Sequence, residues 1–203
     1  MPQQSLPNSI FTPRDVWHGG FYELALEIGT TSNDGLRLAL TELWSYDKLK
    51  GCYLNKHKEP YEQQSVLPAD VHSGHHYYGI ARLRDDVTCA CGSIVMRFDE
   101  QPTDWIHFYL PMAALSKVYR VKAFPFDDLS QHTDWQRELD TWLVNLARHV
   151  WSQASVRFGL VGFELSTDIS SADIARHGVP ATRNEGYLWP SNGELEYFPR
   201  NTD

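Results

Sequence analysis

The chain has 203 residues, of which 42 % are apolar and 13 % aromatic, so it can bury the core of one sizeable domain and is not disordered as a whole. Its formal net charge is −8, and residues 1–100 and 101–203 each carry nine basic and thirteen acidic residues. Because the acidity is evenly spread, no basic footprint is left for nucleic acid or for an anionic membrane surface, and we expect neither as a partner.

The N-terminal half predicts an arm followed by a strand and a helix. Residues 1–17 contain several prolines and no hydrophobic periodicity, which predicts an extended arm ahead of a single domain formed by residues 18–203. Residues 21–29, "FYELALEIG", alternate between apolar and polar side chains, as a half-buried strand does. Apolar residues recur every three or four positions in 36–49, which predicts an amphipathic helix, and residues 52–74 are polar and loop-like.

The middle of the chain predicts three strands and the longest helix. Residues 76–84 and 87–98 are strand candidates joined by a tight Asp-Asp turn, and a further strand begins at residue 104. Tryptophan, leucine and valine recur at helical spacing through residues 134–153, which predicts a long amphipathic helix.

The remaining elements complete the fold prediction. The almost continuous apolar run 156–165 predicts a central strand, residues 171–178 predict a short helix, and an Asn-Gly turn predicts a C-terminal β-hairpin. This order predicts an α+β fold: a single, mostly antiparallel sheet with the long helix (about 134–153) and the shorter helix (about 36–49) packed on it.

Membrane insertion, secretion and disulfide bonding find no support in the residue pattern. No run of about 18 uncharged apolar residues is present, and the N-terminal residues lack a basic region followed by an apolar one. Three cysteines are too few, and odd in number, for a disulfide framework. We therefore expect a cytoplasmic protein, with no membrane association and no cofactor.

One stretch combines residue types that often bind metals: His72, His75, His76, Cys89 and Cys91. In a hairpin in which Arg84 faces Val87, His76 and Cys91 lie about 13 Å apart along the ladder, at about 3.3 Å per residue. Zinc ligands lie within about 2.3 Å of the ion, so one site cannot hold both residues. We expect the cysteines to pack in the core and no metal to bind, while the three histidines with a distant carboxylate remain an alternative metal site.

Motifs for catalysis are absent from the sequence. There is no G-x-S-x-G elbow, Walker A loop, G-x-G-x-x-G or H-E-x-x-H. Asp104 and His107 lie three apart, on opposite faces of a strand, which argues against a dyad. Glu164 ends an apolar strand and can serve as an acid or a base, although a structural hydrogen-bonded role is favoured. We expect no catalysis; the alternative is an enzyme or a small-ligand-binding protein with a pocket near His72–His76 or Glu164.

Aromatic and acidic residues are interleaved near the C-terminus, which is typical of a surface that binds a basic protein. The candidate partner-binding residues are Glu185, Tyr187, Trp189, Glu194, Glu196 and Tyr197. The alternative is that the aromatic side chains only pack the last hairpin on the sheet.

The stretches "GGFYELALEIG", "WQRELDTWLVNLARHV" and "GYLWPSNGELEYFP", in a compact acidic chain, resemble bacterial immunity proteins that neutralise polymorphic toxins, and related uncharacterised bacterial α+β proteins. The resemblance implies a non-catalytic module that blocks a basic toxin protein through charge complementarity and a large interface. We infer no site residues from the resemblance, because no motif specific to a toxin class is present.

Overall fold

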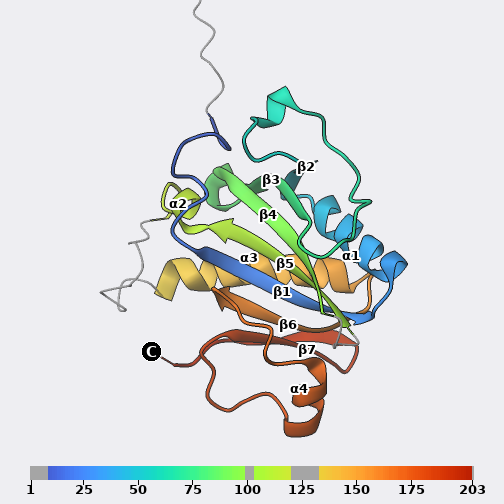
Figure 1. Cartoon of the computed structure of the whole chain (residues 1–203). Coiled ribbons are helices and arrows are strands. Elements are labelled where there is room, and N and C mark those ends of the chain that lie inside the picture. Colours follow the sequence, from blue (N-terminus) through green and yellow to red (C-terminus); the bar gives the residue numbers. More distant parts are fainter. Residues whose placement is uncertain (1–8, 99–102, 120–132, 203) are drawn as a thin grey trace, which may run out of the picture.

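The computed structural model of the chain describes residues 9–98, 103–119 and 133–202, which form one antiparallel sheet with helices packed on it (Figure 1). The sheet has eight strands in the order β2-β3-β4-β5-β1-β6-β7-β8. The strands are β1 (Phe21–Thr30), β2 (Leu49–Tyr53), β3 (His76–Arg82), β4 (Thr88–Arg97), β5 (Thr103–Pro111), β6 (Val156–Phe163), β7 (Gly186–Ser191) and β8 (Glu194–Phe198). The helices are α1 (Asn33–Ser45), α2 (Met112–Leu115), α3 (Thr133–Trp151) and α4 (Ser171–His177). The predicted α+β fold, with a C-terminal hairpin, is confirmed.

Helices α1 and α3 cover one face of the sheet. Leu24 and Leu26 of β1 point to this face and join the larger core together with Leu40 of α1 and Leu143 of α3. The long helix is confirmed to within two residues at its end, because its apolar stripe faces the sheet. None of the described helices is long and apolar enough to cross a membrane.

The shorter helix is displaced from its predicted position of 36–49. It starts at Asn33, because the Ser32 hydroxyl accepts a hydrogen bond from the Gly35 amide and caps the helix. It ends at Ser45, because Leu49–Tyr53 pairs with β3 as an edge strand that the sequence analysis did not predict.

The opposite face of the sheet, here called the second face, carries Glu23, Ala25 and Glu27 of β1. Figure 1 views the sheet from this side, with α3 running behind the strands and α4 at the lower end. Ile174 of α4 packs in a smaller core with Ala25, Trp105, Phe158, Leu160 and Tyr187. The fully buried Glu27 carboxylate accepts hydrogen bonds from the Ser171 amide and hydroxyl, and so fixes the N-terminus of α4.

The N-terminal segment 9–18 is attached to the domain through Glu59. The Glu59 carboxylate accepts hydrogen bonds from the amides of Ile10, Phe11 and Thr12 and from the Thr12 hydroxyl. Burial opposes ionisation of this carboxyl group, but the four hydrogen bonds outweigh it and lower its pKa to about 2. Phe11 is buried in the core, so the described part of the predicted arm packs against the domain; residues 1–8 lie outside the described residues.

The hairpin of β3 and β4 has a different register from the predicted one. His76 lies opposite Ile94, one residue away from its predicted partner. The reason is the turn: the Leu83 amide bonds to the Val87 carbonyl around a three-residue loop, Arg84–Asp86, rather than the predicted two-residue turn. Two residues of this loop adopt left-handed backbone angles, φ of 51° and 59°, which aspartate tolerates better than most residues.

Candidate functional site

A cavity of about 350 Å³ lies on the second face, between the N-terminal segment and the chain that follows β6. Its polar lining comes from strands β1, β3 and β5 and from two connecting segments: Glu23, Lys56, His76, His107, Tyr109 and Glu164. A larger hollow of about 520 Å³ is bordered by Ser9 and Lys117. Both residues lie close to chain outside the described ranges, so the site is built from the smaller cavity, whose lining is described throughout.

Glu23 and His107 face each other across β1 and β5. The register places His107 opposite Ala25, two residues from Glu23 on the same face of β1, and His107 Nδ1 lies 3.7 Å from Glu23 Oε2. The same carboxylate oxygen accepts a hydrogen bond of 2.8 Å from the Leu165 amide, which holds the side chain in place.

His107 is only 4 % exposed, and its Nε2 has no hydrogen-bond partner among the described residues. A buried polar atom without a partner costs about 1–3 kcal/mol, and native proteins contain few of them. His107 is therefore a buried imidazole at the cavity wall whose Nε2 is enclosed by the protein.

His76 and Tyr109 form a second polar pair in the cavity. His76 Nδ1 lies 3.0 Å from the Tyr109 hydroxyl. Burial, followed by the nearby Lys56 and His75, lowers the pKa of His76, and burial raises the pKa of Tyr109. The tyrosine thus keeps its proton, and its hydroxyl shares one hydrogen bond with the imidazole Nδ1.

Gly92 of β4 allows Tyr109 to lie flat against the sheet. The two residues are opposite each other, and a Cβ atom at Gly92 would come within 2.4 Å of the tyrosine ring and hydroxyl. Only glycine leaves this space open, so the position of the Tyr109 hydroxyl depends on residue 92.

Glu164 closes one end of the cavity. It follows β6 with a left-handed φ of 49°, a conformation that costs a non-glycine residue about 1 kcal/mol or more. Its Oε1 accepts a 2.8 Å hydrogen bond from the Phe21 amide, while its own amide donates to the Phe21 carbonyl. The backbone of β1 therefore fixes the carboxylate at the cavity rim.

Aromatic rings form much of the remaining wall. Trp17 of the N-terminal segment contacts Tyr78 edge to face at 5.3 Å, and Phe21 contacts Tyr109 in the same way at 5.0 Å. Ile94, Met96 and Leu165 complete the apolar lining. Polar groups and flat apolar surfaces therefore meet in one cavity, as is common in small-molecule sites.

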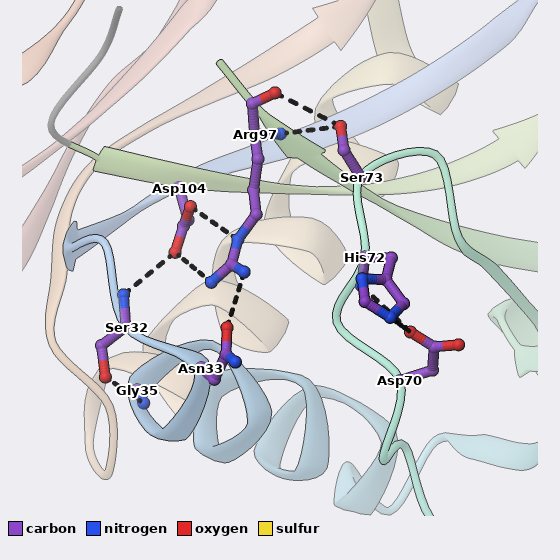
Figure 2. A network of polar contacts seen from close by, with 8 residues as sticks. All are labelled: Ser32, Asn33, Gly35, Asp70, His72, Ser73, Arg97 and Asp104. Atoms are coloured by element: carbon purple, nitrogen blue, oxygen red, sulfur yellow. Dashed lines mark hydrogen bonds and ion pairs between the residues drawn. The ribbon is translucent and has the colours of Figure 1, made fainter. Parts of the chain in front are cut away.

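Asp104 and His107 contact different groups of residues. The prediction that they lie on opposite faces of their strand is confirmed. Figure 2 shows Asp104 receiving two hydrogen bonds of 3.0 Å from the Arg97 guanidinium, which also donates to Asn33. The Ser32 amide donates to Asp104 as well, so this network ties the start of α1 to the ends of β4 and β5. Its role is structural, and it is remote from the His107 pair.

The three histidines of the alternative metal site do not converge. His72 and His75 lie 3.7 Å and 3.4 Å from different oxygens of Asp70, and the first of these contacts is visible in Figure 2. His76 instead stacks on Tyr78 and contacts the cavity. Within the described part of the chain, no group of three or more His, Cys, Asp or Glu residues is arranged to hold a metal ion.

The cysteines of the same stretch point away from the cavity, toward the face of the sheet that the helices cover. Cys89 and Cys91 are buried, unpaired and packed in the larger core beneath the helices. Burial raises the pKa of the Cys89 thiol to about 12. The predicted packing role therefore agrees with their position.

The candidate partner-binding residues of the C-terminal hairpin are divided between the two faces of the sheet. Tyr197 points toward α3, where its hydroxyl donates to Asp140 at 2.9 Å, whereas Tyr187 is buried in the smaller core on the second face. Trp189, Glu194 and Glu196 share the second face, because the register places Trp189 opposite Glu196 and Ser191 opposite Glu194. Glu185 precedes the hairpin and is half-buried.

Sequence reasoning identified His76 and Glu164 as neighbours of a possible pocket, but it missed Glu23, His107 and Tyr109. Alternation in β1 and β5 places these three side chains on one face, and only the pairing of the two strands brings them together. Comparisons with protein-family models, curated proteins and solved structures found no match to the chain.

Proposed function

We propose that the chain is a small-ligand-binding protein and that its ligand occupies the cavity on the second face. The observation that carries the proposal is the lining of this cavity, where Glu23 and the almost fully buried His107 lie beside the polar pair of His76 and Tyr109. The surrounding rings and carboxylates supply both contact area and orientation.

Binding is favoured over catalysis by the residues available. The described lining of the cavity contains no serine, threonine or cysteine, so it offers no hydroxyl or thiol nucleophile of these types. Glu23 and Glu164 are engaged with backbone amides, and Tyr109 is engaged with His76. These contacts make a rigid recognition surface.

The test is a ligand screen by NMR on protein labelled at its imidazole nitrogens. A library of small metabolites is added to the wild type, to Ile94→Trp, which fills the cavity, and to Leu38→Trp, which places the same ring on the exposed side of α1. We expect ligands that shift the His107 signals of the wild type and of Leu38→Trp, and that lose binding in Ile94→Trp. Ligands that bind Ile94→Trp as well as the wild type would refute the cavity as the site.

A second function is supported by the acidic hairpin: an immunity-type inhibitor that binds a basic toxin protein. The supporting observation is that Trp189, Glu194 and Glu196 share one face at β8, an edge strand of the sheet, in a chain of net charge −8. Co-expression with the protein encoded next to this chain should then give a salt-sensitive complex that the double variant Glu194→Gln/Glu196→Gln weakens. Recovery of the chain alone at low salt would exclude this function.

A further inference from the structure

We infer that the ligand of the cavity carries a protonated amine or guanidinium group, which binds at the end formed by Glu23, Glu164 and His107. This inference rests on the proposed small-ligand function and names the chemical class of the ligand.

Two carboxylates at this end each have one oxygen free to accept hydrogen bonds. Glu23 uses Oε2 for the Leu165 amide, and Glu164, which is exposed at the cavity rim, uses Oε1 for the Phe21 amide. The other oxygen of each carboxylate has no hydrogen-bond partner among the described residues. An ammonium group has three donors and a guanidinium group five, and neither has an acceptor. A cationic group of this kind therefore matches the two free carboxylate oxygens in both charge and hydrogen bonding.

The aromatic side chains of the cavity wall also favour a positively charged ligand group. Phe21 and Tyr109 both line this end of the cavity and pack together edge to face. Aromatic faces attract cations, and this attraction becomes stronger as water is removed. The apolar body of an organic amine can contact these rings while its charged group meets the carboxylates.

Lys56 is the cationic side chain in the cavity lining, and it lies near His76 of β3. Its charge opposes a cation in the cavity, so the two carboxylates must outweigh it for a cationic ligand to bind.

The volume limits the ligand to a compact molecule. At about 350 Å³, the cavity is near the lower end of the roughly 300–1,000 Å³ that small-molecule sites occupy. A single ring or a short chain bearing one amine fits this range.

The test compares three probes with the same ring and different charge: benzylamine, which is cationic at neutral pH, benzyl alcohol and benzoate. Affinities are measured by titration calorimetry and by the shifts of the His107 imidazole signals. We expect benzylamine to bind at least about tenfold more tightly than the other two, because only its ammonium group forms charge-assisted hydrogen bonds with the carboxylates.

The variants separate the roles of the charged residues. Glu23→Gln and Glu164→Gln keep an oxygen for the backbone hydrogen bond, so they should fold normally and weaken benzylamine by about tenfold. Glu194→Gln, at an exposed glutamate of β8 outside the cavity lining, is the matched control and should leave the affinity for benzylamine unchanged. Thermal unfolding confirms that all three variants are folded.

Two results would overturn the inference without touching the proposed function. One is equal binding of benzyl alcohol and benzylamine; the other is failure of all three probes while the metabolite screen yields ligands that Ile94→Trp abolishes. Loss of the cavity as a binding site, seen as unchanged ligand binding in Ile94→Trp, would instead refute both.

Discussion

Replacing Glu59 with glutamine should detach the N-terminal segment that forms one wall of the cavity. The glutamine carbonyl can accept only some of the hydrogen bonds that the carboxylate receives from Ile10, Phe11 and Thr12. The side-chain NH2 group of the glutamine is a donor, and it would face the remaining donors of the segment without being able to accept from them. Trp17 belongs to this segment and lines the cavity, so the change should also weaken ligand binding.

The size of the effect follows from the pKa of Glu59, which is lowered from 4.5 to about 2. At about 1.4 kcal/mol per pH unit, the carboxylate contributes about 3 kcal/mol, which solvent screening in this loop region reduces to about 2 kcal/mol. Because the folded pKa is below the unfolded one, this stabilisation is complete above about pH 4.5 and is lost as the pH falls toward 2. More than half of it should be gone at about pH 3.

Urea unfolding at pH 7 and pH 3 tests this prediction, with Glu196→Gln on the exposed surface as the matched control. Glu59→Gln should be about 2 kcal/mol less stable than the wild type at pH 7, and the gap should narrow at pH 3. Hydrogen exchange of the Ile10, Phe11 and Thr12 amides should accelerate in the variant. A Glu59→Gln protein as stable as the control at pH 7, or a gap that does not change with pH, would contradict the proposed role of the carboxylate.

Three other features can be tested by stability and reactivity measurements. Gly92→Ala should destabilise the protein by about 1–3 kcal/mol in urea, because its Cβ would overlap the Tyr109 ring; the control Gly35→Ala in α1, where the nearest neighbour of the Cβ is 3.7 Å away, should be neutral or stabilising. Asp104→Asn should cost about 3 kcal/mol in the same assay, because it leaves a largely buried arginine without its carboxylate, and a loss below about 0.5 kcal/mol would argue against the network. A thiol reagent at pH 8 should modify no cysteine in the folded protein and all of them after unfolding, since burial raises the pKa of the Cys89 thiol to about 12; rapid labelling of the native protein would show that the thiols are accessible.

The helices and most strands could be predicted because their hydrophobic periodicity is local. The stripe in 134–153 and the alternation in 21–29 depend only on which side chains face the core, and the structure places α3 and β1 there. The edge strand Leu49–Tyr53 was missed because its burial is uneven and its pairing with β3 comes from outside its own sequence. The start of the shorter helix was missed because a serine cap, rather than an apolar residue, determines it.

The residues of the candidate site also divide into those that the sequence indicated and those that only the fold brings together. Glu164 and His76 could be noticed as polar residues at the ends of apolar strands, and the strand period correctly separated Asp104 from His107. Glu23 and His107 could not be paired, because they lie on strands far apart in the sequence whose register follows from the whole sheet.

The sequence by itself determined most of the secondary structure, the α+β class and the burial of the cysteines, because side-chain periodicity and apolar content act over a few neighbouring residues. Only the tertiary structure decided that β1 lies between β5 and β6, and so brought Glu23, His107 and Glu164 to one cavity. Strand order and register depend on how all the elements share one core, a property that no short segment carries.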